Sequence, residues 1–231
     1  MTVSSWIFET LPYLAVIVAS VFAIIRFKYR AFSVSSLSSQ FLEGRLLFWG
    51  SVPWHYGVLV VLAGHMLAFL APQTLLLFNA KLSRLYLLEV TGMAFSILAV
   101  FGLFILLWRR LFNKRIRAVT SKMDTLVLLL LLFQVLTGLC TAILYRWGSS
   151  WFAATVSPYL WSLFSLHPES NRLQPMPILI KIHFTGAFLL IALLPFSRLI
   201  HALSVPVHYL FRPPQLVIWN RKSRKEFFNG E

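Results

Sequence analysis

The chain has 231 residues, of which 58% are hydrophobic and 12% charged, and its mean hydropathy is +0.76. Soluble domains are close to half apolar and a quarter charged, so this composition excludes an ordinary water-soluble enzyme. With 21 Phe and 8 Trp, the chain carries too much apolar surface to be disordered. The formal net charge of +14 is compatible with a nucleic-acid partner, with anionic lipid or with a membrane-topology signal.

Five apolar stretches are long enough to cross a bilayer, for which a helix needs about 20 residues. They comprise residues 7–25, 48–70, 85–108, 125–144 and 178–203. The first stretch carries Glu9 and Pro12 and has no basic segment before it, so we read it as a mature span and not as a signal peptide. The predicted fold is all-α: a single membrane domain over residues 1–231 with five transmembrane helices, in which residues 204–231 form a tail.

The basic residues between the spans are distributed unequally. Lys and Arg number four in 26–47, six in 109–124 and five after 203, against two in 71–84, two in 145–177 and none before the first span. The positive-inside rule therefore predicts an outer N-terminus and a cytoplasmic C-terminus in a multi-pass protein of the cell membrane. Because the charges are spread over three short segments without a nucleic-acid-binding module, we expect no nucleic-acid partner.

Four of the six histidines lie inside predicted spans. His55 and His65 are in the second span, and His183 and His201 are in the fifth. An ionisable side chain within hydrocarbon is costly and indicates a functional site by default. A single histidine of this kind could equally be a structural residue that is hydrogen-bonded to a carbonyl, but two pairs on two helices favour ligation.

The order of the spans allows one pairing of these histidines. The second span runs outward and the fifth runs inward, so His65 meets His183 near the outer face and His55 meets His201 near the inner face. At 1.5 Å per residue, His55 and His65 are separated by about 15 Å along the second span, and His183 and His201 by about 27 Å along the fifth. An inclined ligand between each pair and a bend at Pro195 would share this mismatch. On a continuous fifth helix, the 18-residue interval makes His183 and His201 face the same way.

Paired histidines at one depth, without carboxylate or thiolate ligands, suit a six-coordinate haem iron better than zinc or a di-iron centre. The sequence contains no Cys-x-x-Cys-His motif. The predicted cofactors are therefore two non-covalent haem b groups with these four axial ligands. Gly57, Gly64 and Gly186 lie within three positions of the ligands and are expected to let a macrocycle approach the helices. Cys140, in an apolar run, is interpreted as a small core residue.

Three charged residues near the spans have competing interpretations. Arg198, one turn before His201, is either a snorkelling arginine or a partner of a haem propionate. Glu89 is expected to be a helix-end polar residue near Arg84 and not a proton relay. Asp124 is expected in the N-terminal cap region of the fourth span, or paired with the nearby basic residues Arg117 and Lys122.

Two histidines lie outside the spans. His167 and His208 neighbour prolines and are expected at the surface. The first cytoplasmic loop and the tail from Phe211 to Glu231 are the segments expected to meet a soluble partner.

Several stretches around the histidines resemble the gamma subunit of membrane-bound respiratory nitrate reductase, a dihaem cytochrome b. The matching stretches are His55 with Gly64-His65, Arg109-Arg110-Leu111-Phe112 with Ile116-Arg117-Ala118, Met123-Asp124 with Gln134 and Gly138-Leu139, and Leu194 to His201 continuing into Ser204 to Leu210. The likeness covers residues 5–218. It departs from the family pattern at Glu89 and in the basic tail from Arg221 to Lys225.

The resemblance implies that the four histidines ligate two b haems in the pairing given above. It implies that quinol is oxidised near the outer haem and that electrons pass inward to an iron–sulfur beta subunit beside a molybdenum-containing alpha subunit. The family's quinol-contacting lysine corresponds to Arg84 or to Lys81, and Gly64, beside the outer ligand, is the third residue expected at the quinol site. The chain would thus be the quinol-oxidising electron-transfer subunit of an oxidoreductase, without acid–base catalytic residues of its own.

Two other functions remain open at this stage. The same scaffold could serve another dehydrogenase or run in reverse, by quinone reduction or nitrite oxidation. From a different class, a haem-free transporter or scaffold could use the histidines to bind metal or protons.

Overall fold

The computed structural model describes residues 6–29 and 42–203, and the regular elements in these two ranges are all helical. The long helices are α2 (Leu11–Tyr29), which continues the π-helical turn η1 (Trp6–Thr10), α3 (Arg45–Leu70), α5 (Leu82–Phe112), α7 (Lys122–Leu144) and α10 (Ile178–Leu193). Each belongs to an apolar segment long enough to cross a membrane. The prediction of an all-α multi-pass membrane fold with five spans is confirmed, and the tail lies outside the described residues.

Two of the helices begin at residues suited to a helix start. A bilayer offers no water for these groups, so apolar runs form helices with internal hydrogen bonds. Pro72, which needs no N–H partner, starts the short helix α4 (Pro72–Asn79) directly after α3. At the start of α7, Ser121 and Asp124 form a reciprocal capping box. The Asp124 side chain therefore lies in the cap region, as expected.

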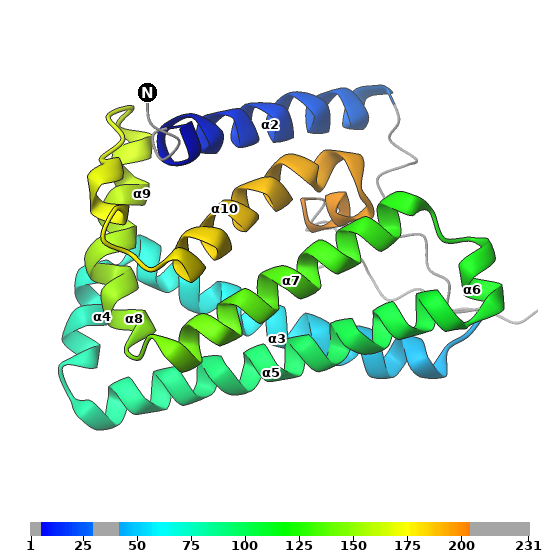
Figure 1. Cartoon of the computed structure of the whole chain (residues 1–231), viewed down its shortest axis with the longest axis horizontal. Coiled ribbons are helices and arrows are strands. Elements are labelled where there is room, and N and C mark those ends of the chain that lie inside the picture. The colour runs from blue at the N-terminus through cyan, green and yellow to red at the C-terminus, as the bar shows by residue number, and fades with distance from the viewer. Residues whose placement is uncertain (1–5, 30–41, 204–231) are drawn as a thin grey trace, which may run out of the picture.

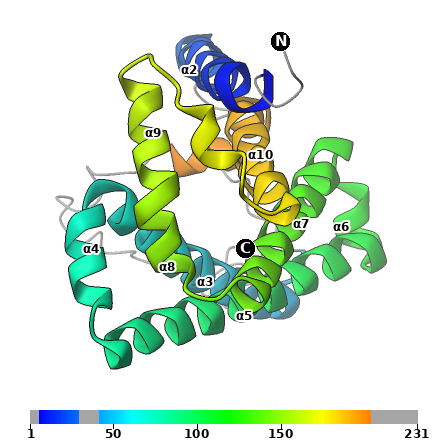
Figure 2. The same ribbon diagram turned by 60° about the vertical axis from the view of Figure 1, so that its left-hand side comes forward.

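The long helices pack side by side in an order different from the chain order. Their principal contacts run from α2 to α10, then to α7, α5 and α3, as Figure 1 shows. The two histidine-bearing helices α3 and α10 are consequently connected through α5 and α7, and Figure 2 shows this arc from another side. This arrangement leaves α3 and α10 facing one another across the bundle.

The contact between α3 and α5 depends on glycines. A Cβ atom on Gly57 would lie 2.6 Å from the carbonyl oxygen of Phe95, and one on Gly102 would lie 2.4 Å from the backbone nitrogen of Trp54. Small residues allow two helix backbones to approach this closely in a membrane. Gly57 therefore packs against α5, and the expectation that it faces a macrocycle is wrong.

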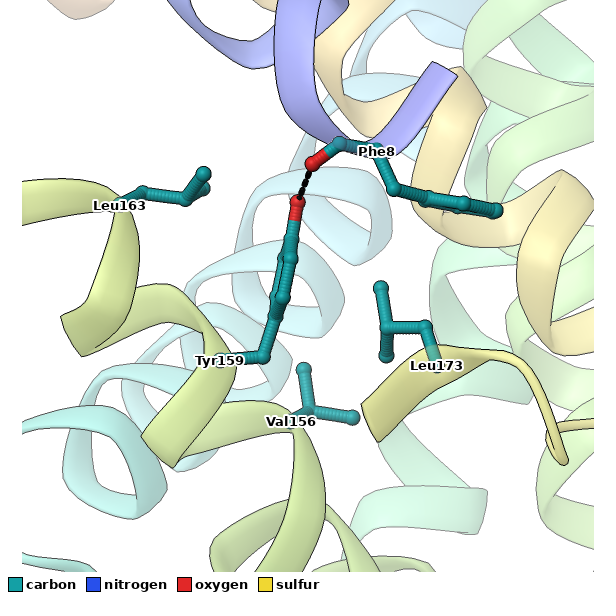
Figure 3. Packing of buried hydrophobic residues seen from close by; sticks show 5 residues of the cluster. All are labelled: Phe8, Val156, Tyr159, Leu163 and Leu173. Carbon is teal, nitrogen blue, oxygen red and sulfur yellow. Dashed lines mark hydrogen bonds between the residues drawn. The ribbon is translucent and has the colours of Figure 1, made fainter. Parts of the chain in front are cut away.

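Residues 145–177 fold over the end of the bundle where α3 ends. They form α8 (Gly148–Trp151), η3 (Phe152–Val156), α9 (Ser157–Phe164) and η4 (Ser170–Leu173). Figure 3 shows their buried cluster with the start of the chain: Phe8, Val156, Tyr159, Leu163 and Leu173. The fully buried Tyr159 hydroxyl donates a hydrogen bond to the Phe8 carbonyl, and burial raises the pKa of this phenol, so it remains a donor.

The fifth span differs from its expected form. Regular helix ends at Leu193, ten residues before the expected end, and two 3₁₀ segments follow: η5 (Leu194–Phe196) and η6 (Arg198–Ala202). Pro195 lacks an N–H and its ring disfavours continuation of the helix, while Ser197 has an extended backbone (φ −117°, ψ 177°). His183 and His201 therefore do not share one continuous helix, and their expected common face does not exist.

Many large apolar side chains of the spans are exposed on the outside of the bundle. Leu59 is 62% exposed and Phe104 55% exposed, as expected of side chains that meet lipid or a partner subunit. Cys140 of α7 is also exposed, so its interpretation as a core residue is wrong. Because a transmembrane helix is apolar on all sides, hydropathy alone does not distinguish its lipid-facing from its core-facing residues.

Candidate functional site

The structure brings His55 of α3 and His201 of η6 together. Their ring centroids are 6.4 Å apart and their planes are inclined by 57°. The His55 Nδ1 atom lies 2.7 Å from the carbonyl oxygen of Ser51, one turn earlier. The His201 Nδ1 atom lies 2.6 Å from the carbonyl oxygen of Arg198. Both imidazoles are thus oriented by the backbone that precedes them.

His65 and His183 occupy the other end of the bundle, near the end of α3. The His65 Nδ1 atom lies 2.8 Å from the carbonyl oxygen of Val61, and its ring meets Phe152 edge-on with centroids 5.3 Å apart. His183 is oriented by α7, since its Nδ1 atom lies 3.1 Å from the carbonyl oxygen of Gln134.

All four imidazoles share one feature. Each has Nδ1 within hydrogen-bonding distance of a backbone carbonyl oxygen. A carbonyl only accepts, so at His55, His65 and His201 this contact assigns the proton to Nδ1 and leaves the lone pair on Nε2. That tautomer is the one in which a histidine uses Nε2 as a metal ligand, with its other nitrogen held in place. At His183 the Nδ1 atom also lies 3.2 Å from Gln134 Nε2, an amide donor.

The His183 ring lies directly against the backbone of α7. A Cβ atom on Gly138 would be 2.8 Å from His183 Cε1, and one on Gly186 would be 2.3 Å from Gln134 Oε1. Gln134 Nε2 donates to the His183 carbonyl oxygen at 2.8 Å, and Thr137 Oγ1 is 3.1 Å from His183 Nδ1. Gly186 therefore faces Gln134, and its expected role toward a macrocycle is wrong.

The roles of Gln134, Thr137 and Gly138 were not predicted. Thr137 and Gly138 follow Gln134 by three and four residues. This spacing predicts that the three residues lie on one face of α7. The sequence did not reveal that this surface faces His183, because the packing order of the helices differs from their chain order.

The three residues predicted to contact quinol lie at the His65 end. Lys81 precedes α5 and Arg84 is in its first turn, and both are exposed. The Arg84 guanidinium lies over the ring of Phe78 at 5.5 Å. Gly64 is exposed on α3, and a Cβ atom built there would meet no described atom within 4 Å.

Glu89 has a different partner from the one expected. One carboxylate oxygen accepts hydrogen bonds from the backbone N–H of Ser149 at 2.8 Å and from its hydroxyl at 2.7 Å. Residues five apart on a helix point in directions about 140° apart, so Glu89 does not lie beside Arg84. Its carboxylate instead joins α5 to the start of α8.

Asp124 binds two arginines from other segments. Its Oδ1 atom is 2.9 Å from Arg198 Nε, and its Oδ2 atom is 3.3 Å from Arg110 Nη1. The expected pairing with Arg117 and Lys122 is wrong, because the first turn of α7 turns this carboxylate inward, where its side chain is 5% exposed. Arg198 thus forms an ion pair that neither of its two interpretations included.

A second buried ion pair was not foreseen. Arg109, which is 2% exposed, donates from Nε to a Glu43 carboxylate oxygen at 2.5 Å and from Nη2 to the Glu43 carbonyl oxygen at 2.7 Å. Burial acts to raise the pKa of Glu43, but hydrogen bonds from Arg109 and from the Leu46 N–H together lower it below its ordinary value. This pair ties the start of α3 to the end of α5.

The remaining predicted residues lie at the surface or outside the described part of the chain. His167 is exposed, as expected, with Nδ1 2.8 Å from the Ser165 carbonyl oxygen. His208 and the basic residues from Arg221 to Lys225 lie outside the described residues, as do residues 30–41 of the loop between the first two spans, which was expected to be cytoplasmic.

Comparison with known proteins assigns the family. The sequence matches the family model of the nitrate reductase gamma subunit over residues 4–220. It is 32% identical over 216 residues to the nitrate reductase gamma chain of Bacillus subtilis, covering 92% of this chain and 96% of that protein. It is also 32% identical over 217 residues to the respiratory nitrate reductase 1 gamma chain of Escherichia coli, covering 91% and 95%.

A more divergent relative comes from Archaeoglobus fulgidus. That protein, an Hdr-like menaquinol oxidoreductase cytochrome b-like subunit, is 30% identical over 169 residues, which cover 69% of this chain and 48% of the relative. The family match and the two gamma chains cover nearly the whole sequence, including all four histidines. The chain therefore belongs to the nitrate reductase gamma subunit family, whose members are cytochrome b subunits of nitrate reductase complexes.

Proposed function

We propose that this chain is a dihaem cytochrome b that oxidises membrane quinol near the outer face and passes electrons inward to an iron–sulfur subunit. The observation that carries the proposal is the pair of histidines at each end of the bundle. In both pairs, backbone carbonyls hold the Nδ1 atoms, which is the arrangement required of metal-ligating imidazoles.

His55 and His201 would hold one haem between two different segments of the chain. Their ring centroids are 6.4 Å apart, so the fold brings two imidazole donors together at this end of the bundle. No group of three or more His, Cys, Asp or Glu side chains gathers within the described residues. Paired imidazoles are the donor set of a six-coordinate haem, whereas structural zinc takes four protein ligands.

The residues of each site would divide the work between ligation and orientation. His65 and His183 would hold one haem b, and His55 and His201 the other. A bound haem supplies one-electron transfer, which this polypeptide's own side chains do not. Gln134 and Thr137 orient His183, and the carbonyl of Arg198 orients His201.

Charge asymmetry supports an orientation with the His65 and His183 pair near the outer face. A quinol needs a polar partner at the membrane boundary and a nearby electron acceptor. Lys81 and Arg84 are exposed cations at the His65 end, and Gly64 leaves the adjoining surface of α3 open. Proton release at this side, with electrons moving inward, would contribute to the membrane potential.

The proposed partners follow from the same orientation. Electrons leaving the His55 and His201 end would pass to the iron–sulfur beta subunit and then to the molybdenum-containing alpha subunit on the cytoplasmic side. Gamma chains of nitrate reductase, such as those of B. subtilis and E. coli, are the relatives that support these partners.

The relative from A. fulgidus favours a second candidate function. Its name describes a cytochrome b-like subunit of an Hdr-like menaquinol oxidoreductase, so a related subunit occurs in a protein that is not named a nitrate reductase. The present chain would then transfer electrons between quinol and another reductase. Identification of the subunits that copurify with the chain distinguishes this candidate from the first.

A pyridine haemochrome spectrum of the purified chain tests the core of the proposal. We expect two b haems per chain and their reduction by added quinol. A preparation that is folded, as judged by circular dichroism, but contains no haem would overturn the proposal in favour of a haem-free scaffold or transporter.

A further inference from the structure

The segment that carries His201 is irregular. His55, His65 and His183 lie within long regular helices, whereas His201 lies on η6, which follows two interruptions of the helical hydrogen bonds at Pro195 and Ser197. A broken helix leaves carbonyl groups without their usual partners. The position of His201 therefore depends on contacts from outside its own segment.

Arg26 of α2 supplies one such contact. Its Nη1 atom donates to the carbonyl oxygen of Pro195 at 2.6 Å and to that of Ser197 at 2.9 Å. The ring of Phe22, one turn earlier, packs against that of Phe196 with centroids 4.8 Å apart. The last turns of α2 thus hold the backbone on which η6 begins.

Asp124 of α7 supplies the second contact. Its Oδ1 atom pairs with Arg198 Nε at 2.9 Å, and the carbonyl oxygen of the same Arg198 lies 2.6 Å from His201 Nδ1. The carboxylate is almost fully buried and is anchored by its reciprocal capping box with Ser121. Asp124 thereby connects the rigid start of α7 to the residue that orients the imidazole.

We propose that Arg26 and Asp124 are positioning residues for His201, which clamp the irregular segment 194–202 from two sides and set the orientation of its imidazole at the iron. The inference rests on the proposed function, because it assumes a haem between His55 and His201. Neither residue ligates the iron. Each acts through the backbone that presents His201.

The test uses the full chain in its membrane complex, with two pairs of variants. Arg26→Met removes the donors to the two carbonyls, and Lys28→Met removes an equal charge from the same turn of α2, where Lys28 lies over the ring of Tyr29. Asp124→Asn keeps an oxygen for the capping box but removes the charge that pairs with Arg198. Arg110→Met is its control, because it removes the other ion pair of the same carboxylate.

The measurements are haem content, redox titration of each haem and the EPR spectrum of the oxidised low-spin irons. EPR responds to the orientation and bonding of the axial imidazoles, whereas a change in electric field alone moves only the potential. We expect Arg26→Met and Asp124→Asn to broaden or shift the EPR signal of the His55 and His201 haem. We also expect them to change its reduction equilibrium about tenfold, or about 59 mV for one electron.

The controls decide the interpretation. Lys28→Met and Arg110→Met should leave that EPR signal unchanged, and the His65 and His183 haem should remain unchanged in every variant. Asp124→Glu, which restores a carboxylate, should recover most of the wild-type signal. Equal effects of Arg26→Met and Lys28→Met, no change of the EPR signal, or loss of both haems would each overturn the inference. Failure of the proposed function itself would be seen separately, as a wild-type chain without haem.

Discussion

The two histidine pairs are held by different kinds of interaction. At the His65 end, His183 lies on a regular helix and its ring rests against Gly138 of α7. At the His55 end, His201 lies on an irregular segment that is held by the ion pair of Arg198 with Asp124 and by the Arg26 guanidinium, which donates to two carbonyls. One end therefore depends on close packing, and the other depends on charge.

The difference has a physical origin in the fifth span. The carbonyls of an unbroken helix are satisfied within the helix, so His183 is oriented by neutral groups of α7, Gln134 and Thr137, and by close packing against Gly138. The break at Pro195 releases carbonyls, and charged donors are the strongest groups available to satisfy them. We therefore expect the His65 and His183 pair to be sensitive to added side-chain volume, and the His55 and His201 pair to be sensitive to loss of charge.

The largest effect is expected from removal of a ligand. His65→Ala and His183→Ala should each abolish the same spectral component, because a b-type iron that lacks one imidazole loses its low-spin state or its haem. His55→Ala and His201→Ala should abolish the other component. Optical and EPR spectra of the four variants check this pairing, and loss of one common component in His65→Ala and His201→Ala would refute it.

A large effect on stability is expected at the buried pair of Glu43 and Arg109. Glu43→Gln leaves a nearly inaccessible guanidinium without its counter-ion, which should cost about 3 kcal/mol. Since the folded-state pKa of Glu43 lies below 4.5, the wild-type pair stabilises the fold fully above that pH and loses its contribution as the pH falls further. Thermal unfolding of the detergent-solubilised protein measures the loss.

The exposed pair of Glu169 and Arg172 provides the control for this prediction. Its side chains are 53% and 44% exposed, so Glu169→Gln should cost less than about 1 kcal/mol. Equal destabilisation by Glu43→Gln and Glu169→Gln would show that burial of the first pair does not matter for stability.

The close packing at the other end predicts a selective loss. In Gly138→Ala, the new methyl group would lie 2.8 Å from His183 Cε1, so the ring has to move away from α7. We expect partial loss or a shifted spectrum of the His65 and His183 haem alone. Gly92→Ala on α5, where a Cβ atom meets nothing within 4 Å, should leave both haems unchanged. A disturbance confined to the His55 and His201 haem would contradict the comparison of the two ends.

The smallest effect is expected at the proposed quinol site. Replacement of both Lys81 and Arg84 by Ala should slow quinol-driven haem reduction about tenfold, which corresponds to loss of one charged hydrogen bond of about 1.5 kcal/mol. Haem content should not change. Rapid mixing with quinol, with and without a quinol-site inhibitor, provides the measurement. Wild-type rates and inhibitor affinity in the double variant would place the quinol site elsewhere.

The order of the spans and the depth of each residue predicted that His55 and His201 lie at one end of the bundle, and the structure has their ring centroids 6.4 Å apart. That the four histidines ligate haem in these pairs stays a prediction. The sequence also predicted the place of Asp124 in the cap of α7, but not the ion-pair partners of Asp124 or the hydrogen-bond partner of Glu89, which come from the end of α5, from η6 and from α8. Local spacing along one helix does not reveal a partner that approaches from another segment.

The sequence by itself determined the five spans, the all-helical fold and the family, because a bilayer requires continuous apolar helices and these leave an unmistakable pattern of composition. Tertiary structure alone decided the contacts of Gly57 and Gly186 with neighbouring helices and the clamps around His201. These features depend on which face of each apolar helix turns inward. Hydropathy carries no information about that face when every side of the helix is apolar, so packing among the helices decides it.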